Sequence, residues 1–361
     1  GVGLNPLRGQ NNVQGAADMG VQPHQGAGYM DVNDPEIQNY YAEKYQISTM
    51  PKKEGLKIPE MLEAAISGKF KALWIMGEDT LMTDPNTMHI RKAMEQLDIL
   101  IVQELFMSAT AEMADVVLPA SSYFEKNGTF TNGERRVQRV NKVIDPIGNT
   151  KSDGQMIIDM MYKLGYEQPT GPEYNAAKIL DEIADVIPFM KGITWERLGT
   201  NGLQWPVLEN GTDTQIIHRD GNFKRGKGKF HHFDFEETPE LVEHRKKYPF
   251  ILTTARQLEH YNAGTMTRRT DNQELSPMDY LEINPLDAAE KEIGADDKVR
   301  IFSDRGSVII PVKLTYLVKP GVVRTTFHQP EIFINMLTGN VGDEFTLTPE
   351  YKVVAVDFEK V

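Results

Sequence analysis

The stretch Ala72-Leu73-Trp74-Ile75-Met76-Gly77 is a short apolar run that ends in glycine, which predicts a buried β-strand. A helix is expected next from Asp84 to Gln96, with Asp84 as its cap and Pro85 behind it, and then a strand from Asp98 to Gln103. A second helix is expected to begin within Ser108–Met113, before a third strand, Asp115–Pro119. Strands and helices that alternate with such short connections predict an α/β domain with a parallel sheet.

Polar residues directly follow these predicted strands. Because ligands bind at the carboxyl ends of parallel strands, the candidates for ligand contact are Gly77, Glu78, Asp79, Gln103, Glu104, Pro119 and Ala120. The acidic residues among them have two interpretations. Their carboxylates cap the following helices, which is common, or they bind the ribose hydroxyls or the purine edge of a nucleotide.

The chain changes character from Tyr248 onward. Helices are predicted before this point, opening near Asp34 and Ile58 and covering Gln155–Leu164 and Glu173–Val186, with a loop over residues 209–230. After it, short strands are predicted at residues 250–254, 298–302, 308–312, 322–327 and 353–358, with a hairpin turn at 303–307. These strands favour a β-barrel domain of roughly 110 residues.

Composition excludes several classes of protein. The 361 residues carry a formal net charge of −13, which argues against a nucleic-acid binder, because phosphate binding requires an excess of Lys and Arg. The chain has no cysteine, so it supplies no disulfide, iron–sulfur ligand, Cys-based zinc site or thiol nucleophile. No apolar run is long enough to span a membrane. The first residue is Gly1, without an initiator Met or signal peptide, and we expect a portion of a longer protein.

One arginine stands among amides and glycines near the start. The segment Leu7-Arg8-Gly9-Gln10-Asn11-Asn12-Val13-Gln14-Gly15 contains no carboxylate to neutralise Arg8. The guanidinium either bonds to carbonyl groups of its own loop or forks onto an anion such as a carboxylate. Composition leaves both interpretations open.

Three further polar tracts also have two interpretations each. Residues 128–136 are expected to form a solvated turn, or else an ion-paired clamp. Residues 256–265 follow a strand and offer donors suited to a pyrophosphate, although a loop histidine is more often only a hydrogen-bonding partner. The basic residues at 219–229, close to two phenylalanines, resemble a nucleic-acid tract. The overall acidity and the glycines favour an exposed loop instead.

No P-loop, nucleophile elbow, zinc-peptidase or Rossmann motif is present. The order of the motifs nevertheless resembles that of molybdopterin-dependent formate dehydrogenases. Gly3–Gly15 resembles the arginine-bearing stretch of those enzymes. Residues 76–79, 114–119 and 130–136 resemble the α/β domain of the wider molybdopterin oxidoreductase family, and residues 256–261 and 348–352 resemble its C-terminal barrel. The resemblance runs in order over essentially the whole chain.

The resemblance implies a fold and an activity. The fold is a parallel-sheet α/β dinucleotide-binding domain followed by a six-stranded β-barrel that binds a molybdopterin dinucleotide. The domains are a substrate and pterin loop at residues 1–30, the α/β domain at 31–240 with a helical part at 151–200, and the barrel at 246–361. The activity is the reversible oxidation of formate to CO2 at molybdenum or tungsten held by two molybdopterin guanine dinucleotides.

It also implies what lies outside this chain. A Cys or selenocysteine metal ligand with a neighbouring His, and the cysteines of a [4Fe-4S] cluster, are expected in an N-terminal part of the same subunit. A selenocysteine codon there would explain why the chain begins at Gly1. The other expected partners are iron–sulfur electron-transfer subunits of the diaphorase, ferredoxin or hydrogenase type, in the cytoplasm. No nucleic acid and no membrane span is expected.

The resemblance assigns roles to individual residues. Arg8 would orient the formate carboxylate, and Gln10 would contact the pterin. The guanosine ends would be held by Asp79, Thr83, Gln103 and Asp153, with Gly77, Glu78 and Glu104 beside them. In the barrel, the cofactor contacts would be Arg256, Gln257, His260, Tyr261, Asn262, Asn335, Tyr351 and Lys352. Phe327 stands where family members often have Tyr, and Ala120 stands where a Ser can bind the cofactor, which leaves Ala120 only its backbone.

Two other functions stay open. One is a different reaction on the same scaffold, such as nitrate reduction. The other is a cofactor-binding or assembly module without catalysis. Arg8 and its amides separate the first from formate chemistry, because oxo transfer has no need of a carboxylate fork. The chain alone is expected to oxidise no formate, because it lacks the metal ligand.

Overall fold

A computed structural model describes residues 5–48 and 50–361. Residues 1–4, which begin the Gly3–Gly15 motif, lie outside the described residues. The chain forms two compact units that interleave along the sequence. Unit 1 contains the residues up to Lys57 and Pro119–His231, and unit 2 contains Ile58–Leu118 and His232–Val361. The domain boundaries inferred from the sequence stay a prediction.

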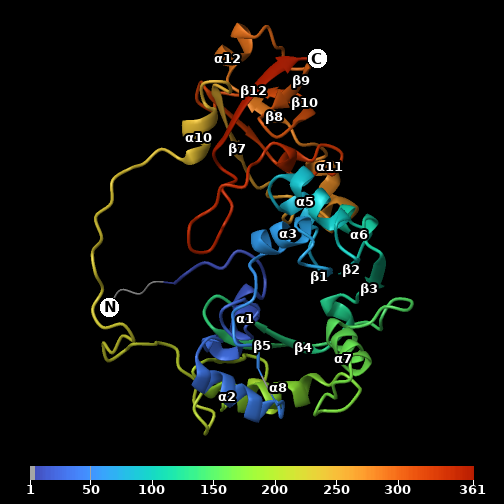
Figure 1. Ribbon diagram of the computed structural model, residues 1–361, viewed down its shortest axis with the longest axis vertical. Helices are drawn as coiled ribbons and strands as arrows, with labels where there is room; N and C mark the ends of the chain where they lie inside the picture. The colour runs from blue at the N-terminus through green and yellow to red at the C-terminus, as the bar shows by residue number, and fades with distance from the viewer. Residues whose placement is uncertain (1–4, 49) are drawn as a thin grey trace. The chain divides into compact units, whose positions relative to one another are not determined.

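Unit 2 contains the predicted parallel sheet (Figure 1). Strand β1 (Ala72–Met76) pairs in parallel with β2 (Ile99–Glu104), in a register that sets Ala72 opposite Ile99 and Met76 opposite Gln103. The third strand is β3 (Val116–Pro119), next to β2. Helices α3 (Ile58–Ile66), α4 (Thr80–Thr83), α5 (Thr87–Glu95) and α6 (Ala109–Glu112) accompany the sheet.

The helix after β1 differs from the prediction. Asp84 is not the N-cap of a helix: it is the C-cap residue of α4, which ends at Thr83, and α5 begins at Thr87. The cap of α5 is Asn86, whose side chain accepts a hydrogen bond from the amide of His89 at 3.3 Å. The cause is Pro85, which disfavours helical geometry in the residue before it, and Asp84 is extended with a ψ of 154°. The carboxylate of Asp84 is therefore available for another role.

The second part of unit 2 is a closed six-stranded barrel, as predicted. The strands follow the order β10-β8-β11-β7-β12-β9. β10 pairs in parallel with β8, and β11 in parallel with β7, while the other neighbours are antiparallel. The strands are β7 (Phe250–Thr254), β8 (Leu281–Ile283), β9 (Lys298–Phe302), β10 (Ser307–Leu314), β11 (Val322–Thr325) and β12 (Val354–Lys360).

Strand β8 was not predicted, because three residues are too few for a periodic pattern. The barrel interior is filled by alternating apolar side chains such as Val299, Ile301, Ile310 and Phe358. Short helices surround the strands: α10 (Pro239–His244), η4 (Thr267–Arg269), α11 (Asn272–Leu275), α12 (Pro285–Glu290) and η5 (Ile334–Met336).

The barrel and the parallel sheet are joined within unit 2. The side-chain amide of Asn335 donates to the carbonyl of Met82 at 2.7 Å, and the amide of Asn86 donates to the hydroxyl of Thr338 at 3.2 Å. Met82 also packs into the apolar core of the barrel. The loop after β1 is therefore held against barrel residues, which positions the polar groups described below.

Unit 1 contains a small antiparallel sheet that was not predicted. The solvated turn predicted for residues 128–136 is only the tip of a hairpin, around residues 132–135. The rest of the tract contributes β4 (Gly128–Thr131) and the start of β5 (Arg136–Val140); β5 pairs with β4 and with β6 (Leu203–Gln204). The alternative of an ion-paired clamp is confirmed at the hairpin, where Arg136 Nε lies 2.7 Å from Glu134 Oε1.

Helices pack around this sheet. As predicted, Asp34 caps α2 (Pro35–Lys44), and its carboxylate accepts from the amide of Glu36 at 2.9 Å. The predicted helices near 155 and 173 begin instead at Asp153 and Ala176. The remaining elements of unit 1 are α1 (Val13–Asp18), η1 (Ala27–Tyr29), η2 (Tyr123–Glu125), α7 (Asp153–Lys163), α8 (Ala176–Val186), η3 (Pro188–Met190) and α9 (Trp195–Leu198).

The predicted loop over residues 209–230 contains no helix or strand, and this irregular conformation continues to Thr238. Figure 1 shows it as a long yellow arc that leads into α10. Among the helices that the structure describes, none has the length and apolarity to cross a bilayer.

Candidate functional site

The loop after β1 carries three carboxylates, and one of them is structural. Gly77 has a φ of 65°, which a glycine adopts without strain and which turns the chain away from the strand. Asp79 is buried. Its Oδ1 accepts from the amide of Thr110 at 3.1 Å and from the Thr110 hydroxyl at 2.7 Å. Asp79 thus ties the loop after β1 to helix α6, which follows β2.

The charges of the other two carboxylates of this loop, Glu78 and Asp84, act on the barrel residue Tyr351. Glu78 Oε1 accepts from the hydroxyl of Thr83 at 2.5 Å. Burial, together with the charge of Glu78, raises the pKa of Asp84 to about 7. Burial raises the pKa of Tyr351 as well, and the charges of Asp84 and Glu78 act in the same direction. Among the described residues, no cation lowers the pKa of Asp84.

Two cations, Arg256 and Lys352, also lie near Tyr351. Arg256 Nη1 donates to Asn262 Oδ1 at 2.7 Å, and its guanidinium lies 4.5 Å from the ring centroid of Phe327. Lys352 Nζ donates to the carbonyl of Thr254. Partial burial lowers the pKa of Arg256, and burial together with the charge of Arg256 lowers that of Lys352. Neither cation pairs with a carboxylate among the described residues.

We name Glu78, Asp84, Arg256, Tyr351 and Lys352 the polar cradle. In it the charge of Glu78 acts on Asp84 and that of Arg256 acts on Lys352. Among the described residues, the two carboxylates form no ion pair with the two cations. Like charges held together without counter-ions are costly unless a ligand compensates them. A ligand with phosphates for the cations and hydrogen-bond donors for the carboxylates matches this arrangement.

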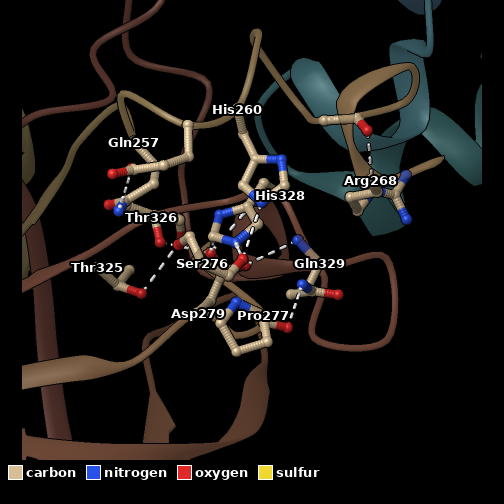
Figure 2. Close-up of polar contacts among 12 residues, drawn as sticks. Gln257, His260, Arg268, Ser276, Pro277, Asp279, Thr325, Thr326, His328 and Gln329 are labelled. Atoms are coloured by element: carbon tan, nitrogen blue, oxygen red, sulfur yellow. Dashed lines mark hydrogen bonds and ion pairs between the residues drawn. The ribbon is translucent and has the colours of Figure 1, made fainter. Parts of the chain in front are cut away.

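The predicted cofactor residue His260 lies in a buried polar network (Figure 2). Its ring stacks on His328 with centroids 4.3 Å apart, and Nε2 of both rings donates to the carbonyl of Ser276, at 2.8 and 3.2 Å. Because a carbonyl only accepts, both Nε2 atoms carry hydrogen. Nδ1 of His260 lies 3.0 Å from the hydroxyl of Thr267.

Asp279 holds the other side of this network. It is fully buried, and its Oδ1 lies 2.6 Å from Nδ1 of His328. It also accepts from the hydroxyl of Thr326 and from the amide of Gln329, the latter at 2.9 Å. Asp279 and His328 were not among the site residues predicted from the sequence, since no motif links them. The network braces the loop that carries Arg256, Tyr261 and Asn262.

In unit 1, Arg8 is exposed and makes one side-chain hydrogen bond, from Nε to Gln14 Oε1 at 3.2 Å. The amide nitrogen of Gln14 donates to Asp18 at 2.8 Å and to the hydroxyl of Tyr29 at 2.7 Å, which turns its oxygen toward Arg8. Asp18 also accepts from Trp205 Nε1 at 2.8 Å, and burial raises its pKa. Among the described residues, neither terminal nitrogen of Arg8 has a partner.

Asp153 is the other charged candidate in unit 1. It begins α7 and pairs with Lys126. A cavity of about 270 Å³ is lined by both residues and by Tyr174, and a second one of about 610 Å³ lies on the other side of Lys126. Space for a ligand group thus lies next to this ion pair. In the same unit Gln10 is exposed, and Ala120 is buried in a backbone bridge with Lys151.

The remaining candidates lie in unit 2. Gln103 is buried at the end of β2, and Glu104 Oε1 accepts from the amide of Leu105 at 2.6 Å. The amide of Gln257 donates to Glu259 at 2.7 Å. Asn335 is occupied in the junction to Met82. No group of three or more His, Asp or Glu side chains suited to a metal occurs in the described part of the chain.

Comparison with known proteins identifies two regions of the chain. Residues 3–162 match the molybdopterin oxidoreductase family, and residues 250–355 match the molydopterin dinucleotide binding domain. The chain belongs to the molybdopterin oxidoreductase family. Over its whole length it is 44% identical to the F420-dependent formate dehydrogenase subunit alpha of Methanocaldococcus jannaschii and 41% identical to the F420-dependent formate dehydrogenase 2 subunit alpha of Methanococcus maripaludis.

The chain spans 53% of the length of each of these two relatives. Among solved structures, it resembles the acetylene hydratase from Pelobacter acetylenicus with a TM-score of 0.66 and 15% identity. This likeness covers 90% of the chain and 50% of the hydratase, and it shows a shared fold. The family thus accounts for both the parallel sheet and the closed barrel.

The polar cradle fits the dinucleotide of this family. Its unpaired cations, Arg256 and Lys352, suit phosphate oxygens, while the carboxylates Glu78 and Asp84 suit donors such as ribose hydroxyls or the edge of a guanine. The neighbouring Phe327 and Tyr261 supply aromatic surface. The chemistry of the donor set therefore agrees with a molybdopterin dinucleotide.

Proposed function

We propose that this chain is part of the catalytic subunit of a formate dehydrogenase that interconverts formate and CO2. The observation that carries the proposal is the state of Arg8. Its Nε is fixed by Gln14, while its two terminal nitrogens have no partner among the described residues. Two parallel N–H groups form a planar fork that matches a carboxylate in shape and charge. The relatives' names supply the same substrate independently.

Arg8 would act by binding and orientation. It would neutralise the formate carboxylate and fix the direction of the formate C–H bond, so that chemistry starts from one geometry. Gln14 would keep the fork in place, because its own amide is anchored to the buried Asp18 and to Tyr29. Gln10, on the same exposed loop, would contact the pterin.

Two molybdopterin guanine dinucleotides would be held by the chain. Arg256 and Lys352 would bind phosphate groups, and Glu78 and Asp84 would accept hydrogen bonds from a nucleoside. Asp153 would face a second guanosine from unit 1. When bound, the molybdenum or tungsten of this cofactor accepts the two electrons that formate loses. The other predicted contacts are Gly77, Asp79, Thr83, Gln103, Glu104, Ala120, Gln257, His260, Tyr261, Asn262, Phe327, Asn335 and Tyr351.

The chain covers about half of its relatives, with 53% of their length, so the rest of the reaction would depend on other parts. The further metal ligand and a [4Fe-4S] cluster would come from the remainder of the subunit. Electrons would pass to iron–sulfur partner subunits. The two named relatives are F420-dependent enzymes.

The test is the activity of the purified full-length subunit. We expect formate-dependent reduction of a viologen dye, together with molybdenum or tungsten and two guanine nucleotides per subunit by mass spectrometry. Residues 1–361 alone should show no formate oxidation. Reduction of nitrate in place of oxidation of formate would contradict the proposal, as would a loaded subunit inert toward both. Turnover by residues 1–361 alone would disprove the dependence on the rest of the subunit.

A further inference from the structure

The segment that connects the two units exposes an unusual number of phenylalanine side chains. We call residues 213–238 the strap. Phe230, Phe233 and Phe235 are 106%, 84% and 92% exposed, and Phe223 is 57% exposed. A single exposed ring is ordinary on a protein surface, but four within thirteen residues form a concentrated apolar surface in contact with water. Such a surface is typical of an interaction site.

The strap also has a charge that the rest of the chain lacks. Residues 218–230 contain five Lys and Arg residues and one Asp, in a chain whose net charge is −13. Residues 234–237 then contain three acidic residues. Phe233 and Phe235 alternate along the sequence with Asp234 and Glu236. The second half of the strap therefore places aromatic rings directly beside carboxylates.

The chain holds the strap only near its ends, where Arg135 donates to the carbonyls of Thr214 and Gln215 and Glu237 pairs with Arg245. Between residues 216 and 236 the side-chain contacts are local: His218 bonds to the carbonyl of Asn222 at 2.7 Å and packs on Phe223, and His232 lies 3.5 Å from Asp234. Every residue from 221 to 237 is exposed. A stretch with four exposed rings and only local contacts gains its order from a surface that covers it.

We infer that the strap lies against the part of the subunit that residues 1–361 do not include. The relatives are about twice as long, since the chain spans 53% of each, so a body of comparable size is available in the same polypeptide. A covalently connected partner acts at a high effective concentration, which suits a segment without structure of its own. The surface that receives the strap carries apolar recesses for its rings and carboxylates for its basic half.

The experiment is limited trypsin digestion of the full-length subunit, compared with residues 1–361, followed by mass spectrometry. In residues 1–361, cleavage after Arg219, Lys224, Arg225, Lys227 and Lys229 should be rapid. In the full-length subunit it should be at least tenfold slower. The exposed Lys52 and Lys53 serve as the internal reference for trypsin activity.

Two variants of the full-length subunit separate the strap from a general change of fold. The triple variant Phe230→Ser, Phe233→Ser, Phe235→Ser should lose most of the protection from trypsin. The matched control Leu317→Ser, at a residue 84% exposed outside the strap, should keep it. Retention of full protection in the triple variant would overturn the assignment of the rings as the anchors.

The other outcomes of the digestion show which molecule covers the strap. Equal cleavage rates in the full-length subunit and in residues 1–361 would overturn the inference. So would protection that arises only after purified partner subunits are added, or only after poly(U) RNA is added. The inference assumes that the chain is part of a longer subunit, but it does not depend on formate as the substrate. An enzyme active on formate with an unprotected strap would refute the inference alone.

Discussion

Replacement of Asp84 by Asn should stabilise the cofactor-free chain at pH 8 and leave its stability near pH 4 unchanged. The pKa of Asp84 rises from its ordinary value of 3.8 to about 7, because the group is partly buried beside Glu78 and has no cation partner. Between these two values the folded state holds a proton that the unfolded state releases. The free energy of unfolding therefore falls as pH rises through this window and levels off above about 7.

The pKa values set the size of the effect. A change from 3.8 to about 7 corresponds to roughly 4 kcal/mol, at about 1.4 kcal/mol for each pH unit. Asn keeps the shape of the side chain and never ionises. The gain in stability of Asp84→Asn over the native chain should therefore grow from near zero at pH 4 to at most roughly 4 kcal/mol at pH 8.

The assay is urea unfolding of the native chain and the variant at pH 4, 5, 6, 7 and 8, with equal m values required. Asp145→Asn is the matched control. Asp145 is an exposed aspartate whose pKa is lowered by its pair with Lys142, so its replacement should produce no gain in stability that grows between pH 4 and pH 8. Parallel pH profiles for the native chain and Asp84→Asn would refute the account of Asp84. They would also remove the main reason to place hydrogen-bond donors of a ligand beside it.

Two further substitutions test the groups that support the site. In the full-length subunit, Gln14→Ala should raise KM for formate by roughly tenfold, which corresponds to the loss of about one hydrogen bond to a charged group. The metal content should stay constant. An unchanged KM would show that Gln14 does not position Arg8. Asp279→Ala should lower the free energy of unfolding by roughly 3 kcal/mol, because it leaves buried donors of Thr326, His328 and Gln329 without an acceptor. The measurement is differential scanning calorimetry, and an unchanged Tm would contradict this prediction.

The sequence predicted those parts of the fold that depend on contiguous patterns. Apolar runs such as residues 72–76 and 250–254 became β1 and β7, because the strands of a packed sheet carry several apolar residues in a row. The expected burial of β1 is confirmed only at Ile75. Strand β8 gives no such signal with three residues, of which the middle one is Glu282. Asp84 was misread as a cap because the effect of Pro85 on the residue before it was not weighed against the N-cap pattern.

The candidate site was predictable only where a motif carried it. Arg8 and Arg256 stand in motifs that resemble a known family, whereas Asp279 and His328 lie 49 residues apart and meet only in the folded barrel. Trp205 reaches Asp18 across 187 residues. Contacts of this kind depend on how strands and loops pack, and no local spacing encodes them. The polar cradle also forms only on folding, since Glu78 and Asp84 come from the loop after β1, Arg256 follows the first barrel strand, β7, and Tyr351 and Lys352 precede the last one, β12.

The central claim, that the fork of Arg8 binds the carboxylate of formate, is tested most directly by Arg8→Lys in the full-length subunit. Lysine keeps the charge but loses the fork, so we expect kcat/KM for formate to fall by about 10²–10³-fold, with metal and guanine-nucleotide content unchanged. Arg300→Lys, at an exposed pair with Glu359, is the control and should have no effect. Unaltered kcat/KM in Arg8→Lys, or a loss of activity matched by an equal loss of cofactor, would contradict the claim.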